Sequence, residues 1–420
     1  NYPTGTNNVA LGDTALDSVE SGGTDNTVIG NRAATATTTG DRNTIYGSDA
    51  YRCNATASDN TAFGYQAMHC NTSGHNNVAI GNALCKNTSG LYNVAMGSGA
   101  LSSNTTASAN VGIGRLALTT NTTGASNTAI GCCALKSNTT ASNNTAVGKD
   151  SLKSNTEGSN NIAIGKSALE SNTTASNNTG VGNGSLKANT TGDCNTALGT
   201  SALDTNTEGT RNIAVGGEAL GANTTASFNN ALGYKALCSN TTGASNISIG
   251  TCSMRINTTG ANNVAVGDKA LCANTTASNN TAVGNASMLS TTTGTCNTAV
   301  GMCSMADNTT GDQNAAFGYF ALQNNTTADF NVAIGGCAMF TNTTGCHNTA
   351  LGRNALYANS TGDNNTAIGC GALDTNTTAD NNTAVGALTL CTNTTGANNT
   401  AMGANALDAN TTASNNTAVG

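Results

Sequence analysis

Cysteine and histidine are the residues of this chain that could support covalent or metal chemistry. The chain has 15 cysteines and three histidines among 420 residues. Cys53 and Cys70 are 17 residues apart, which is also the spacing at which glycines recur along most of the chain. Repeats stacked about 4.8 Å apart would bring the two Cα atoms within disulfide range. We therefore predict a disulfide between Cys53 and Cys70, and the odd total leaves at least one cysteine unpaired or joined to another chain.

The remaining titratable residues show no pattern that is typical of catalysis. His69, His75 and His347 fall at unrelated points of the repeat, and the carboxylates are equally dispersed. No phosphate-binding loop, Ser-His-Asp order or Cys-x-x-Cys motif occurs in the sequence. We therefore predict no catalytic residue, no metal site and no cofactor, and a protein that is not an enzyme. The cysteine content favours an oxidising, extracellular setting.

The tripeptide Asn-Thr-Thr recurs in most repeats and matches the acceptor pattern for N-glycosylation. Asn104, Asn121 and Asn138 are the candidate acceptors. Sugars on every repeat would crowd one another at a spacing of about 4.8 Å. The alternative is a structural role, in which these asparagines form turns and the threonines stack.

Rows of threonine also suggest ice binding, because flat threonine ladders on solenoids can match a lattice. Thr139 and Thr140 are adjacent, so an extended backbone would direct their side chains to opposite faces. Each face would then carry one row, and Glu157 and Glu208 interrupt it.

A period of about 17 residues organises the whole sequence. The repeat reads Asn-Thr-Ala-Val-Gly-x-x-Ala-Leu-x-x-Asn-Thr-Thr-Gly-x-x, and its first glycine recurs from Gly12 to Gly420. A fixed short period over an entire chain predicts a stack of identical units rather than a globule. We number the repeat from 1 to 17, with Asn144 at position 1 and Gly148 at position 5.

The pattern within one repeat predicts β-structure. Position 1 is asparagine and position 4 is apolar in every copy, whereas position 3 is almost always alanine, glycine or serine. Positions 2 and 4 share one strand face, and a small residue at position 3 indicates that another backbone passes close by. Alanine and leucine follow at positions 8 and 9. Two short strands and two turns fit 17 residues, so we predict an all-β fold, a parallel β-solenoid (β-roll) of about 24 coils.

Stacked coils place identical residues above one another, and this explains the constant positions without catalysis. Asparagine above asparagine forms an amide ladder, in which each side chain donates to one neighbour and accepts from the other. The predicted structural ladder includes Asn127, Gly131, Asn144, Gly148, Asn161 and Gly165.

The composition limits both the organisation and the partners of the chain. Residues 1–47 are degenerate copies of the repeat, and residues 48–420 form one continuous regular domain. A net charge of −7 and 9 % charged residues give no basic surface for nucleic acid. No apolar stretch reaches the ~20 residues of a membrane helix, so we expect no membrane insertion in this segment. The start at Asn1 and the end within a repeat predict a segment of a longer array.

The narrow coil also predicts self-association. Two large apolar side chains per coil bury little surface, so packing on partner chains is expected to contribute to stability. We predict a homotrimer, or an end-to-end or lateral filament, with the small side chains at position 3 as the candidate contact.

The core of the repeat resembles a known family. Residues 161–168 read NIAIGKSA and residues 76–81 read NNVAIG, which is similar to the head repeats of trimeric autotransporter adhesins and to repeat arrays of phage tail fibres. The resemblance implies a trimeric left-handed β-roll that holds a binding surface away from a cell. The 17-residue unit is longer than the usual unit of that family, and the Asn-Thr-Thr-Gly segment is not part of its pattern.

These observations together favour a mechanical function. We expect a structural fibre or filament, extracellular or on a virion surface, that acts as a stiff spacer or adhesive shaft. The alternative is a surface-binding module, either an adhesin directed at carbohydrate or host surfaces or an ice-binding protein.

Overall fold

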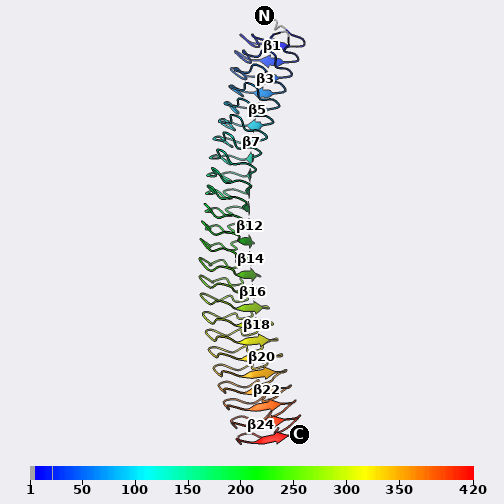
Figure 1. The fold of residues 1–420 in the computed structure, drawn as a ribbon, viewed down its shortest axis with the longest axis vertical. Helices are drawn as coiled ribbons and strands as arrows, with labels where there is room; N and C mark the ends of the chain where they lie inside the picture. Colours follow the sequence, from blue (N-terminus) through cyan, green and yellow to red (C-terminus); the bar gives the residue numbers. More distant parts are fainter. Residues whose placement is uncertain (1–4, 21) are drawn as a thin grey trace. The chain divides into compact units, whose positions relative to one another are not determined.

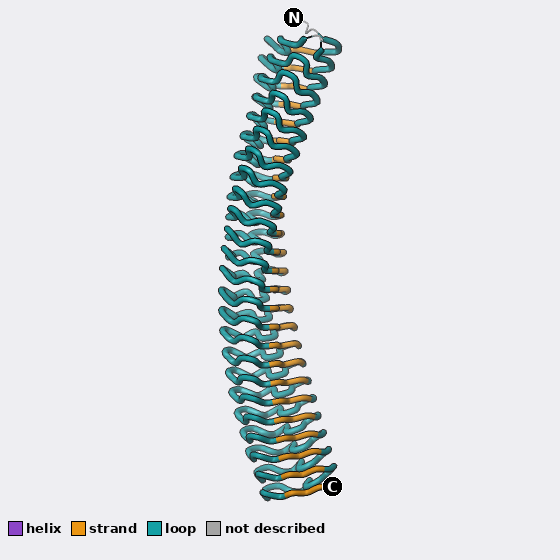
Figure 2. Tube along the Cα trace, in the orientation of Figure 1, coloured by secondary structure: helices purple, strands orange, loops and turns teal. Residues whose placement is uncertain are grey.

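The computed structural model describes residues 5–20 and 22–420. The chain divides into two compact units, one ending at Thr210 and the other comprising Arg211–Gly420. Each unit is a parallel β-solenoid with one coil per repeat, which confirms the predicted fold class (Figures 1 and 2). The described residues contain no helix, and therefore none that could span a membrane. The predicted boundary at residue 47 stays a prediction.

Each coil contributes one three-residue strand, which occupies positions 2 to 4 of the repeat. The strands of the first unit are β1 (Val9–Leu11), β2 (Thr27–Ile29), β3 (Thr44–Tyr46), β4 (Thr61–Phe63), β5 (Val78–Ile80), β6 (Val94–Met96), β7 (Val111–Ile113), β8 (Thr128–Ile130), β9 (Thr145–Val147), β10 (Ile162–Ile164), β11 (Thr179–Val181) and β12 (Thr196–Leu198). Those of the second unit are β13 (Ile213–Val215), β14 (Asn230–Leu232), β15 (Ile247–Ile249), β16 (Val264–Val266), β17 (Thr281–Val283), β18 (Thr298–Val300), β19 (Ala315–Phe317), β20 (Val332–Ile334), β21 (Thr349–Leu351), β22 (Thr366–Ile368), β23 (Thr383–Val385), β24 (Thr400–Met402) and β25 (Thr417–Val419).

Within each unit, every strand pairs in parallel with the next one along the chain. In the pair β8–β9, Thr128 lies opposite Thr145 and Ile130 opposite Val147, so equal positions of the repeat are in register. The same register holds in the second unit, for example between β17 and β18. Figure 2 shows the strands of each unit as a single column, with turns forming the rest of every coil.

The second strand that we predicted in each coil is absent from the described residues. Positions 7 and 9 both adopt left-handed backbone angles, as at Asp150 (φ 58°) and Leu152 (φ 47°). Position 17 does the same, as at Asn160 (φ 60°). An extended run cannot continue through alternating left-handed residues, so the chain after the glycine forms a sequence of tight turns.

The core of each coil is small and half polar. Ala146, Ser151 and Leu152, at positions 3, 8 and 9, are completely buried, and so are the asparagines at positions 1 and 12. A side chain added at Gly112, at position 3, would lie 3.2 Å from Cγ of Leu101, at position 9 of the preceding coil. The small residues at position 3 therefore make room for leucine inside the solenoid.

Candidate functional site

The asparagines at position 1 form the first of two internal ladders. The side-chain oxygen of Asn127 accepts the backbone N–H of Asn144 at 3.0 Å, and that of Asn144 accepts the N–H of Asn161 at 2.9 Å. The Asn144 amide group also donates to the carbonyl of Gly158 at 2.9 Å. The predicted ladder is thus confirmed, although at these residues it runs from backbone to side chain rather than between amide groups.

The asparagines at position 12 form the second ladder, which does join amide to amide. The Asn138 amide donates to the side-chain oxygen of Asn121 at 2.8 Å and to the Ala141 carbonyl at 2.9 Å. Asn121 in turn donates to the side-chain oxygen of Asn104 at 3.1 Å. Asn104, Asn121 and Asn138 are completely buried. Their amide groups lie inside the coil and are bonded there, so the structural role fits these residues and the fold leaves no access for a glycan at the three candidate acceptors.

The glycines at position 5 are required by the stacking of the coils. Gly131, Gly148 and Gly165 have φ angles of 130–140°, a region that other residues rarely adopt. A Cβ atom on Gly148 would lie only 2.6 Å from the carbonyl oxygen of Gly165 in the next coil. Any larger residue at this position would therefore separate neighbouring coils.

The threonines at positions 13 and 14 differ in accessibility. The Thr139 hydroxyl is half-buried and donates to the backbone carbonyl of Thr156, at position 13 of the next coil, at 3.2 Å. Thr140 is exposed. The first of these rows contributes to the stacking of the coils, and the second lies at the surface.

The outer face of each strand carries an apolar stripe, which we define as the side chains at positions 2 and 4. Our interpretation of position 3 as an external contact was wrong, because Ala146 and its equivalents are buried and positions 2 and 4 point outward. Ile164 is 41 % exposed and Leu351 is 44 % exposed. The strongly exposed members at position 4 include Ile130, Ile164 and Leu198 in the first unit and Leu232, Ile249, Phe317, Ile334, Leu351, Ile368 and Met402 in the second.

Several aromatic side chains contact one another along the turns of the second unit. Phe340 stacks on Tyr357 with ring centroids 5.3 Å apart, and its edge meets Phe320 at 6.0 Å. Tyr319 lies against Phe320 at 3.8 Å and is 49 % exposed. These four side chains, Tyr319, Phe320, Phe340 and Tyr357, extend over three successive coils, and we call them the aromatic group.

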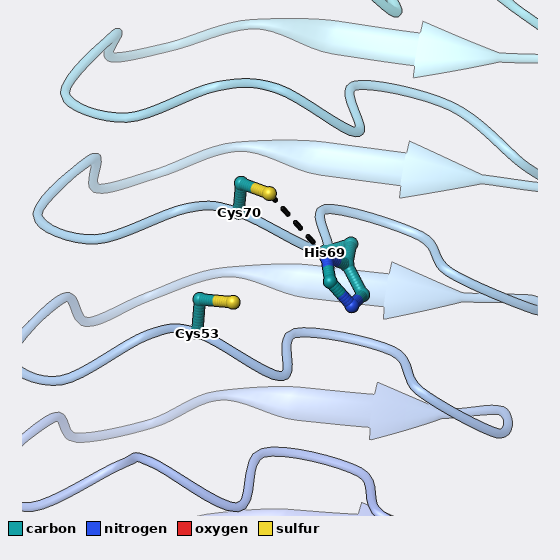
Figure 3. Close-up of side chains that lie close together, drawn as sticks. All are labelled: Cys53, His69 and Cys70. Carbon is teal, nitrogen blue, oxygen red and sulfur yellow. Dashed lines mark hydrogen bonds between the residues drawn. The ribbon is translucent and has the colours of Figure 1, made fainter.

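Two cysteines and a histidine come together between β3 and β5. Cys53 and Cys70 lie on neighbouring coils, and the His69 ring lies beside them, with its Nδ1 atom 3.3 Å from the Cys70 Sγ atom (Figure 3). The ligand atoms of all three residues lie within 4.8 Å of one another. Both thiols are free in the structure, and the predicted disulfide stays a prediction. Burial, together with the Cys53 thiol, raises the pKa of Cys70, and Lys86 opposes that shift.

Sequence reasoning missed this cluster because it treated histidine and cysteine separately. His69 occupies position 10, and Cys53 and Cys70 occupy position 11 of neighbouring coils. Aligning the repeats by position places an imidazole next to two thiols, so the signal was present in the sequence. At two other positions, desolvation raises the pKa of a carboxyl group, that of Asp204 and that of Asp374.

Comparisons of the sequence with protein-family models and with curated proteins give no match. The proposed function therefore rests on the geometry of the coils and on the chemistry of their outer surfaces.

Proposed function

We propose that this chain is a structural shaft, the stiff part of an extracellular or virion-surface fibre, and that it self-associates through the apolar stripe. The proposal rests on one observation, that the interior and the outer surface of each coil have different chemistry. Hydrogen-bonded asparagine rows occupy the interior, while large aliphatic side chains face outward from a regular parallel sheet.

The interior supports the stiffness that a shaft requires. Within each unit, neighbouring coils are tied together by strand pairing, by the asparagine ladders and by the threonine row at position 13. Bending a coil away from its neighbour would break several buried hydrogen bonds at once, and each buried polar group that loses its partner costs about 1–3 kcal/mol.

The apolar stripe supports self-association. In the second unit, eight of the thirteen strands present a position-4 side chain that is at least 36 % exposed. Contiguous apolar patches larger than a few hundred Å² are rare on monomeric proteins and mark interaction sites. A second copy is the natural occupant, because its stripe repeats with the same spacing. The similarity to trimeric adhesin repeats favours a homotrimer.

Sedimentation of the purified chain tests this proposal. We expect the wild-type chain to sediment as an oligomer, and a variant with Ile130→Lys and Ile164→Lys to shift toward monomer because lysines on the stripe repel one another and remain hydrated. Thr140→Lys, at the exposed position 14, is the matched control and leaves the mass unchanged. A monomeric wild-type chain, or equal masses for all three proteins, would contradict association through the stripe. Electron micrographs that show no elongated particles would contradict the shaft.

A surface-binding module directed at carbohydrate is the second candidate, and the aromatic group favours it. Stacked, partly exposed rings offer apolar faces to the C–H groups of sugar rings. Binding of surface glycans to the wild-type chain, lost on Phe340→Ala with Tyr357→Ala, supports this function. If glycan binding survives both substitutions, the glycan-binding surface does not include the aromatic group.

A further inference from the structure

The cluster of Cys53, His69 and Cys70 combines the ligand types that zinc prefers. Two thiols and an imidazole are soft and borderline donors, which select Zn²⁺ over Mg²⁺ or Ca²⁺. The three side chains come from two coils: Cys53 lies between β3 and β4, and the other two lie between β4 and β5. The backbone N–H of Cys53 donates to the carbonyl of His69 at 3.0 Å, which fixes the two coils relative to each other at this point.

The spacing of the ligand atoms agrees with a tetrahedral ion. Zn–S bonds of ~2.3 Å and Zn–N bonds of ~2.0–2.1 Å place sulfur and nitrogen ligands roughly 3.5 Å apart and two sulfurs roughly 3.8 Å apart. The Nδ1 atom of His69 and the Sγ atom of Cys70 are 3.3 Å apart. All three ligand atoms lie within 4.8 Å of one another, so small rotations of the cysteine side chains suffice to enclose an ion.

We propose that Cys53, His69 and Cys70 form a binding site for a thiophilic cation, and that Zn²⁺ is the ion that this site binds. The two thiols release their protons to solvent, and the imidazole binds through Nδ1 in its neutral form. Ligands from neighbouring coils make the ion a clamp between them, so that binding adds to the stability of the stack.

Among the residues that the structure describes, no fourth histidine, cysteine or carboxylate joins the three ligands. Cys85 is the nearest further cysteine along the chain, but its thiol donates to the carbonyl of Gln66 at 3.4 Å and to the side-chain oxygen of Asn82 at 3.4 Å. Cys53 is exposed, so a water molecule or an external ligand can reach the ion.

The disulfide predicted from the sequence would use the same two sulfur atoms. Oxidation would consume both thiolate ligands and leave His69 alone, so the two states exclude each other. The experiment must therefore distinguish a bound ion from an oxidised pair.

Titration of the reduced full chain with Zn²⁺ or Co²⁺ tests the site, with a zinc-binding dye as competitor. The test variants are Cys53→Ser, Cys70→Ser and His69→Ser. Serine occurs naturally at position 10 in Ser102 and at position 11 in Ser103, so these variants are compatible with the fold. Cys194→Ser is the matched control, because Cys194 is exposed and lies outside the cluster.

We expect the wild-type chain and Cys194→Ser to hold one more tightly bound ion than either cysteine variant. With Co²⁺ they show a thiolate-to-metal charge-transfer band that both cysteine variants lack. His69→Ser keeps a band of altered shape and binds about tenfold more weakly or worse. Equal stoichiometry and spectra in all five proteins would overturn the proposal. A Cys53–Cys70 disulfide that re-forms in air in the presence of excess Zn²⁺ would also overturn it.

Discussion

The coils around residues 127–165 and those around residues 43–77 use the same backbone but differ in their interiors. In the first stretch, position 9 is an aliphatic residue such as Leu152, and the asparagine rows run unbroken beside it. In the second stretch, Tyr51 occupies position 9. It is completely buried, and its hydroxyl accepts from the Asn60 amide at 2.6 Å and donates to the Asn43 side-chain oxygen at 3.1 Å.

This difference shows what the solenoid tolerates. The interior accepts a larger and partly polar side chain because the tyrosine hydroxyl bonds to the asparagines around it. The position-1 row persists here, with the Asn60 N–H donating to the Asn43 side-chain oxygen at 3.0 Å, while at position 12 the Asn71 amide donates to the Tyr51 hydroxyl at 3.5 Å. The interior therefore tolerates a change in the size of the position-9 side chain as long as the buried polar groups keep hydrogen-bond partners. The outer surface is freer still, since the same irregular stretch carries the Cys53–His69–Cys70 cluster and an ion pair between Arg42 and Asp59.

The largest expected effect comes from breaking the asparagine row of a regular coil. Asn144→Leu removes the acceptor of the Asn161 N–H and the donor to the Gly158 carbonyl, and leaves both groups buried without partners. We expect a loss of about 3–6 kcal/mol in the free energy of unfolding, measured by chemical denaturation with hydrogen exchange to localise the effect. Thr140→Ala, at the exposed surface of the same coil, is the control. Equal stability of the two variants would show that the rows are dispensable.

A smaller loss is expected where a side chain is forced between coils. Gly148→Ala places a Cβ atom 2.6 Å from the Gly165 carbonyl oxygen at a φ of 130°. We expect a cost of about 2–4 kcal/mol, visible as a lower denaturation midpoint. Gly336→Ala adds the same atom where nothing lies within 4 Å, and it should leave the midpoint unchanged. An equally stable Gly148→Ala would mean that the spacing of the coils is not fixed by this glycine.

The buried Tyr51 hydroxyl predicts how the stability of the coils around residues 43–77 depends on pH. Desolvation raises the pKa of Tyr51 above its usual value of about 10. The folded chain therefore retains a proton that the unfolded chain releases, so stability should fall as the pH rises above about 10. Tyr51→Phe should remove this component of alkaline unfolding, and should cost about 1–2 kcal/mol at neutral pH because the Asn60 amide loses a partner. Identical alkaline profiles of the two proteins would contradict the buried role of the hydroxyl.

The smallest effect is expected at the surface of the same stretch. The Arg42 guanidinium lowers the pKa of Asp59, with which it forms contacts of 2.7 and 2.9 Å. The contribution of this pair is present above the unfolded pKa of aspartate, about 3.9, and is lost as the pH falls through the lower folded value. Because both side chains are exposed, Asp59→Asn should leave the denaturation midpoint nearly unchanged at pH 7 and at high salt. A large shift would show that the pair is far less screened than its exposure indicates.

The sequence was sufficient for the fold class and the asparagine ladder because both follow directly from the period. Equal residues 17 apart must stack if the coils are parallel, and Asn127, Asn144 and Asn161 do so. The inward face of the strand was not predictable in the same way. Position 4 is the most apolar position and yet points outward, because leucine at position 9 fills the interior and leaves room only for alanine at position 3.

The left-handed residues were also beyond sequence reasoning. Leucine at position 9 rarely adopts a positive φ, and a pattern of residue types contains no signal for it. The whole coil imposes this conformation: Leu152 is completely buried, and its N–H donates to the Ala168 carbonyl of the next coil at 3.0 Å. The choice between a glycosylated and a structural asparagine in Asn-Thr-Thr was open in the sequence for a related reason, because the motif does not show whether its asparagine points inward.

The amide rows at position 12 have a consequence for the electrostatics of each unit. From Asn138 to Asn121 and from Asn121 to Asn104, each amide-to-amide hydrogen bond points toward the lower-numbered coil. Their dipoles therefore add head to tail, as peptide dipoles do in an α-helix. Each row therefore carries a dipole whose positive end lies toward low residue numbers. An anion would be attracted to that end, and the energy of a neighbouring row would depend on whether it runs parallel or antiparallel.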